Sequence, residues 1–406
     1  MAHAFSVTYG NVVHQLSGIV DPDYEVLPNP ADWNGAIHAL RDAKAQGYYY
    51  GSPIGVWPVG AHEIMEGQAR FIQMQYLHFG SGGRIDWDDF RALGWLGSGI
   101  YQNAFDLFLT QAGLDWPDSL DHPTVGLFLV ICDMALNPGA GFPCPMRYPQ
   151  TLISDCDPGE RFAFLSAAVR RSCPETATII RTYSFEEYET VTEALAAALK
   201  IDSPLTIART VASWAKRSTG VEVLMREYST MTFGPLNMPI RVLFSHFIAF
   251  LQDKAKRPEV FAWAGAWMAG IRVDQQIVDL FERHGALFVD KPEDRGVFAR
   301  LRAGQDEKAL HAMFEQFFSG AVTYDLVRQW ITEPGPFQFR YTWLVEKAES
   351  WEMENFADSQ MTCRPEARRL LGGDARRGDI VMGEDGFQQL FRQVEDPRTT
   401  TPSPAT

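Results

Sequence analysis

The residues best suited to chemistry lie in one short stretch, residues 61–79, which reads AHEIMEGQARFIQMQYLHF. His62, Glu63, Glu66, Arg70 and Gln73 stand there between large apolar residues. At about 100° per residue of helix, these five side chains form one polar stripe. His62 and Glu66 are four residues apart, a spacing that places two ligands one turn apart and can hold a metal ion. Glu63 lies beside them, where it could act as a general base.

Two orientations of this helix are open. Two apolar faces separate the charged stripe from a narrower polar edge that contains Gln68 and Gln75. If the stripe faces water, Glu66 and Arg70 form an ordinary surface ion pair of two residues one turn apart. If the glutamine edge faces water, His62 and the rest of the stripe point inward. Ionisable groups are rarely buried without a purpose, so our functional hypothesis takes the inward orientation.

Asp133 is a second candidate, because it lies within the apolar segment LFLVICDMALNP. A buried aspartate must be paired, capped or bound to something. It could reach backbone amides in the following NPGAGFP segment, or it could meet His62 and Glu66 from a neighbouring helix. The second alternative predicts a divalent metal ion, zinc or iron, held by His62, Glu66 and Asp133. Glu63 would then assist a metal-activated water in a hydrolysis reaction.

Two short sequences in this helix resemble metallopeptidase motifs. HEIME is similar to the HExxH signature of the zincins, with Glu66 in place of the second histidine. EGQA resembles the EGxA helix that brings the third ligand, a glutamate, in some zinc peptidases. The resemblance implies zinc ligation and hydrolysis. It covers only these few residues, and the chain contains no separate HExxH, so it does not assign the chain to that family.

Two functions from different classes fit these observations. The first is a metal-dependent, hydrolase-like helical enzyme. The second is a non-catalytic helical protein-interaction module, which binds a protein partner or a second copy of the chain. The aromatic content supports the second function, including the tyrosines at 48–50, Trp343 and Trp351. The absence of P-loop, GxSxG and GxGxxG motifs disfavours NTPases, α/β-hydrolases and Rossmann enzymes.

The segments that carry these residues are predicted to be helical. Apolar residues recur at helical spacing in most segments, and alternating strand patterns are scarce. Ser184, followed three residues later by Glu187, predicts a helix start. We therefore expect an all-α, multi-helix globular bundle, organised as one large or two closely packed helical domains. The expected divisions are a domain at 1–150 with the candidate site, a domain at 151–395 and a disordered tail at 396–406, with loop over the first 30 residues.

The composition narrows the classes of partner. The chain has 406 residues and a formal charge of −15, without a basic run, which disfavours nucleic acid and anionic membranes as partners. We attribute this acidity to solubility. No apolar run approaches the roughly 18 residues of a membrane-spanning helix, and we recognise no signal peptide. Five widely spaced cysteines without a CxxC pair favour a reducing, cytoplasmic environment.

Overall fold

The computed structural model describes residues 2–314, with gaps at 50, 54–56, 98, 138, 140–143, 147, 235–236, 292–293 and 303. The described residues divide into two compact units, one within 2–229 and 235–285 and one within 230–234 and 286–314. The predicted all-α class is confirmed, and the second unit adds an antiparallel hairpin of β1 (Phe288–Lys291) and β2 (Asp294–Ala299). Trp343, Trp351, the part of the predicted 151–395 domain beyond residue 314 and the tail at 396–406 lie outside the described residues.

The helices before the hairpin follow the chain in a simple order. They are α1 (Ala2–Val20), α2 (Ala31–Asp42), α3 (Ala61–Gly80), α4 (Trp87–Ala92), α5 (Asn103–Ala112), α6 (Pro123–Leu136), α7 (Leu152–Cys156), α8 (Pro158–Arg171), α9 (Phe185–Leu199), α10 (Pro204–Ala212), α11 (Thr219–Thr230), α12 (Met238–Lys254), α13 (Pro258–Ala262), α14 (Ala264–Trp267) and α15 (Gln275–His284). Short 3-10 turns, η1 (Pro149–Thr151), η2 (Pro174–Thr178), η3 (Trp214–Lys216) and η4 (Gly270–Arg272), connect some of them. The boundary predicted near residue 150 lies inside the first unit, where α5 and α6 pack on α8.

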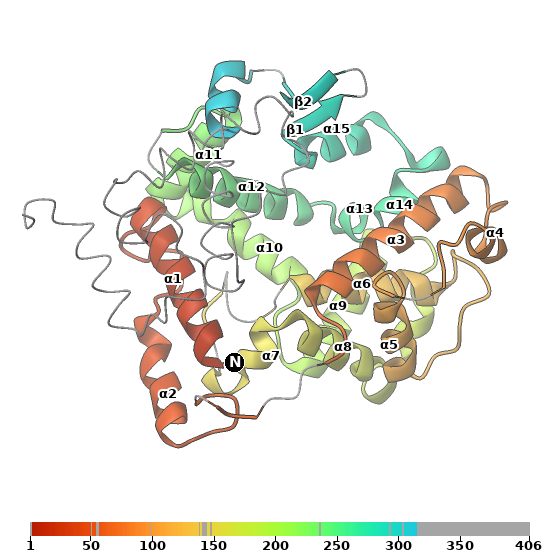
Figure 1. Cartoon of the computed structure of the whole chain (residues 1–406), viewed down its shortest axis with the longest axis horizontal. Coiled ribbons are helices and arrows are strands. Elements are labelled where there is room, and N and C mark those ends of the chain that lie inside the picture. The colour runs from red at the N-terminus through yellow and green to blue at the C-terminus, as the bar shows by residue number, and fades with distance from the viewer. Residues whose placement is uncertain are drawn as a thin grey trace, which may run out of the picture. The chain divides into compact units, whose positions relative to one another are not determined.

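Helix α6 is almost wholly enclosed by other helices of the first unit. Every residue from Thr124 to Ala135 is buried, and α6 contacts α3, α8, α9 and α13 (Figure 1). A helix that is apolar on all sides must be surrounded by protein. Arg161 of α8 donates from Nε to the Ala135 carbonyl at 2.8 Å and from Nη1 to the Asp155 carbonyl at 2.5 Å. These bonds satisfy carbonyls in the last turns of α6 and α7, where the helix itself supplies no donor.

The loop predicted for the first 30 residues is wrong for residues 2–20, which form α1. Tyr9, Val13, Leu16 and Val20 are buried at spacings of four, three and four residues, which is the pattern of one helix face. β-Branched residues and glycines lower the helix propensity of this segment. Packing against α7 and α12 supplies the stabilisation that the local sequence lacks.

Helix α3 contacts α5, α6 and α14 (Figure 1), and these contacts fix its rotation. Ile64, Phe71 and Met74 face the core and are completely buried. The contact with α14 is close because Gly265 has no side chain. A Cβ atom at this position would lie 2.2 Å from the Ile72 carbonyl oxygen. This rotation decides which polar residues of α3 reach water.

Candidate functional site

The structure places the predicted polar stripe of α3 toward solvent. His62 and Gln73 are exposed, with 67% of the His62 side chain accessible, whereas Gln75 is completely buried. The predicted inward orientation of the stripe is therefore wrong. Gln75 is accommodated in the core because its Nε2 donates to the Leu120 carbonyl at 3.2 Å and to the Tyr183 hydroxyl oxygen at 3.3 Å.

The two predicted metal ligands on α3 lie near each other, as their spacing implies. His62 Nε2 is 3.7 Å from Glu66 Oε1. Glu63 turns back to the start of the helix, where it accepts a hydrogen bond from the Gly60 amide at 2.9 Å. This bond lowers the pKa of the Glu63 carboxyl. A carboxylate with a lowered pKa is a weaker base, so the contact that Glu63 makes here is that of a helix cap.

Asp133 lies in a buried polar network that joins α6, α9 and α12. Its Oδ1 is 2.5 Å from Lys254 Nζ, and its Oδ2 accepts a hydrogen bond from the Tyr188 hydroxyl at 2.6 Å. Asn137 Nδ2 also donates to Oδ1, at 3.0 Å. The Lys254 side chain is only 1% exposed. Burial, with the nearby Asp133 carboxylate, raises the pKa of Tyr188 well above its usual range, so this hydroxyl remains a hydrogen-bond donor.

The structure thus brings Asp133 to Lys254 and Tyr188 rather than to His62 and Glu66. Within the part of the chain that the structure describes, no three histidine, cysteine, aspartate or glutamate side chains are grouped so that they could hold a metal ion. The zinc or iron site remains a prediction from the sequence.

Arg70 has the least expected surroundings of the stripe residues. Its guanidinium carbon is 4.8 Å from the ring centroid of Trp95 and 4.3 Å from that of Tyr101, two residues of the segment between α4 and α5. The surface ion pair considered for Arg70 and Glu66 is not formed, and Glu66 lies beside His62 instead. Among the described residues, the buried Nε of Arg70 has no hydrogen-bond partner.

The geometry at Arg70 is suited to binding an anion. Aromatic rings within about 6 Å attract a guanidinium group and restrict its motion. Within the described segments, the two Nη groups of Arg70 make no hydrogen bond. Unlike Nε, they are not buried. Arginine donates up to five hydrogen bonds and accepts none, and its planar fork matches a carboxylate. Arg70 therefore presents unused donors at the surface of α3.

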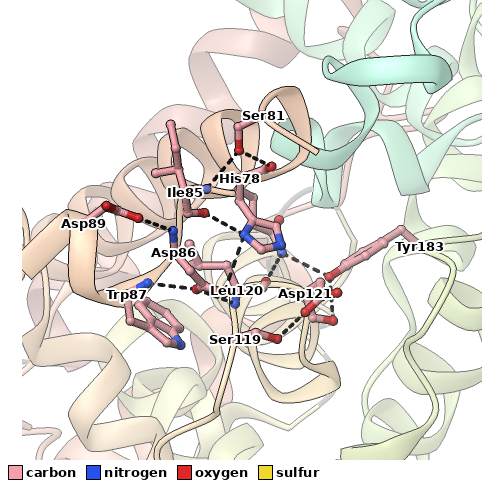
Figure 2. Close-up of polar contacts among 11 residues, drawn as sticks. His78, Ser81, Ile85, Asp86, Trp87, Asp89, Ser119, Leu120, Asp121 and Tyr183 are labelled. Carbon is pink, nitrogen blue, oxygen red and sulfur yellow. Dashed lines mark hydrogen bonds and ion pairs between the residues drawn. The ribbon is translucent and has the colours of Figure 1, made fainter. Parts of the chain in front are cut away.

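A second polar cluster surrounds His78 near the end of α3, and Figure 2 shows its contacts. His78 Nδ1 donates to the Ile85 carbonyl at 2.8 Å and lies 3.7 Å from Asp86 Oδ2. Asp86 Oδ1 accepts from the Leu120 amide at 3.2 Å. The Tyr183 hydroxyl donates to the Asp121 carbonyl, in the loop before α6, at 3.2 Å. Burial raises the pKa of Tyr183. These bonds join the turn after α3 to the loop before α6, so they hold the fold together.

Comparison of the chain with protein families, with curated proteins and with solved structures finds no match. In the described part of the chain, none of the helices is both long enough and apolar enough to cross a membrane. The contacts described above are therefore the basis for any inference about function.

Proposed function

We propose that the chain is a non-catalytic helical protein that binds a protein partner through the Arg70 surface, defined by Arg70, Trp95 and Tyr101. One observation carries this proposal. The two rings hold the Arg70 guanidinium, while the described residues offer its donors no acceptor. Arginine, tryptophan and tyrosine are also the residues that most often dominate binding energy at protein interfaces.

Holding Arg70 in place before a partner arrives would favour binding. Immobilising a flexible side chain at an interface costs about 0.5–1.5 kcal/mol. Trp95 and Tyr101 already restrict the guanidinium, so part of this cost is met when the protein folds. Arg161, by contrast, pairs its buried Nε with the Ala135 carbonyl.

Exposed apolar side chains lie in the same connecting segment. Leu93 is 64% exposed and precedes Trp95 by two residues, and Tyr101 is 37% exposed. Single exposed apolar residues are common and would not by themselves indicate an interface. In the segment that carries Trp95 against Arg70, they provide exposed apolar surface of the kind that interfaces bury.

The proposal can be tested by site-specific crosslinking followed by affinity measurements. A photoreactive amino acid at Leu93, in cells that naturally express the protein, should crosslink a partner that the same amino acid at Leu243 does not. Leu243 is a matched control because it is 61% exposed and lies on α12. With the purified partner, Arg70→Ala should weaken binding at least about tenfold, while Arg91→Ala should not.

Arg91 is an exposed arginine of α4 paired with Asp88 at 2.8 Å, so its replacement controls for loss of a surface charge. Equal affinities of the native protein and Arg70→Ala would refute the proposal. Equal crosslinking from Leu93 and Leu243 would also count against it.

A further inference from the structure

We infer that the group recognised by Arg70 is the carboxylate of an aspartate or glutamate in the partner, next to an apolar side chain. This inference rests on the proposed function and specifies the partner's chemistry. It depends on which edge of the guanidinium is free, on the charges nearby and on the exposed leucine of the adjoining segment.

The free edge of Arg70 is the end of its fork. Nε is the buried atom, whereas the two Nη groups are not enclosed by the described residues. Arg272 provides a comparison, because its guanidinium also lies over aromatic rings, those of Phe79, Tyr183 and Trp267. Its buried unpartnered atom is Nη1, so the fork of Arg272 is partly closed. An open pair of Nη groups can donate two parallel hydrogen bonds to the two oxygens of one carboxylate.

Acidic residues lie one turn from Arg70 on α3 and beside the segment that carries Tyr101, and they disfavour a ligand with more than one negative charge. Glu66 lies one turn before Arg70 on α3. Asp106 on α5 accepts hydrogen bonds from Gln102, the residue after Tyr101. The whole chain carries a formal charge of −15. A phosphate group with nearly two negative charges at neutral pH would meet more repulsion here than a carboxylate. Nucleic acid would meet still more, because its phosphates are closely spaced.

The exposed leucine indicates what should accompany the carboxylate. Leu93 is 64% exposed at the C-terminal end of α4, two residues before Trp95. An apolar side chain of the partner could cover it while the neighbouring acidic side chain reaches Arg70. The bound segment is therefore an acidic residue flanked by leucine or a similar apolar residue.

The test uses the full chain and three synthetic peptides with blocked ends, so that the central side chain alone differs. The central residue between two leucines is glutamate, glutamine or phosphoserine. The native protein should bind the glutamate peptide at least about tenfold more tightly than the glutamine peptide, and more tightly than the phosphoserine peptide. Arg70→Lys should remove most of the preference for glutamate over glutamine, since lysine has no fork. The control variant Arg91→Lys should bind each of the three peptides with the affinity of the native protein.

Several outcomes would overturn the inference. Equal binding of the glutamate and glutamine peptides, tighter binding of the phosphoserine peptide, or no detectable binding of any peptide would each do so. Sedimentation velocity adds a further test, because a dimer that Arg70→Lys dissociates would identify a second copy as the occupant. The proposed function fails separately, if Arg70→Ala leaves the affinity for the crosslinked partner unchanged.

Discussion

Replacing Lys254 by methionine removes the positive charge that faces Asp133 in the core of the first unit. Methionine retains an unbranched chain of similar length, so the main change is electrostatic. Asp133 would remain buried, with hydrogen bonds from Tyr188 at 2.6 Å and Asn137 at 3.0 Å. Removing one member of a buried pair typically costs about 3–5 kcal/mol of unfolding free energy. We expect a loss near the lower end, about 3 kcal/mol, because these two donors still stabilise the carboxylate.

The double variant Asp133→Asn/Lys254→Met separates the pair from its surroundings. Asparagine is uncharged and can still accept a hydrogen bond from Tyr188, so no isolated charge stays in the core. We expect this variant to lie within about 1–2 kcal/mol of the native protein and to be more stable than Lys254→Met. Urea unfolding followed by tryptophan fluorescence and by circular dichroism measures all three proteins and checks that the two probes agree.

A surface ion pair supplies the control. Arg209 and Glu189 are 3.1 Å apart with side chains 53% and 34% exposed, so Arg209→Met should cost no more than about 1 kcal/mol. The reasoning is refuted if Lys254→Met costs as little as Arg209→Met. It is also refuted if the double variant is no more stable than Lys254→Met, since the two charges would then not be coupled.

Three further predictions concern Glu66, Asp253 and the metal site predicted from the sequence. Glu66→Leu should change the unfolding free energy by no more than about 0.5 kcal/mol, because Glu66 lies at the surface, and a loss of several kcal/mol would contradict its placement. Burial raises the pKa of Asp253, but hydrogen bonds from His284 and Arg283 outweigh this effect and lower it to about 2. An aspartate in the unfolded chain has a pKa of about 3.9. The stabilisation of the folded state by ionised Asp253 should therefore be largely complete above about pH 4 and be lost as the pH falls to about 2. In a pH series of unfolding curves, Asp253→Asn should lose less stability between these pH values than the native protein does. The metal site predicted at His62, Glu66 and Asp133 would require about one zinc or iron ion per chain that His62→Ala loses, and elemental analysis showing no bound metal in the native protein would refute it.

Local signals in the sequence predicted many of the helices correctly. Ser184 and Glu187 form the expected reciprocal bonds, with Ser184 Oγ accepting from the Glu187 amide at 3.2 Å and the Glu187 carboxylate accepting from the Ser184 amide at 3.0 Å. Such signals depend on residues within one turn, so they do not require knowledge of the tertiary fold. Segment 2–20 lacked a comparable start signal, and its helix was missed.

The candidate site was harder to predict because its contacts come from distant parts of the chain. The side-chain nitrogen of Gln75 donates to Leu120 and Tyr183, which lie 45 and 108 residues away. A helical wheel distinguishes only polar from apolar residues, so it predicts Gln75 at the surface. Asp133 is paired with Lys254, 121 residues away. The same limitation applies to Arg70, because local spacing predicts a partner on the same helix, whereas the aromatic rings come from another segment.

Asp133 and Arg70 differ in how far the described residues satisfy their hydrogen-bonding groups. Both carboxylate oxygens of Asp133 have donors close by, so its burial is explained within the fold. Arg70 is supported by two rings, yet its buried Nε has no acceptor among the described residues. An unpaired buried donor costs about 1–3 kcal/mol, and attraction to an aromatic ring returns about 0.5–2 kcal/mol. The fold thus leaves the fork of Arg70 available, as the proposed binding role requires.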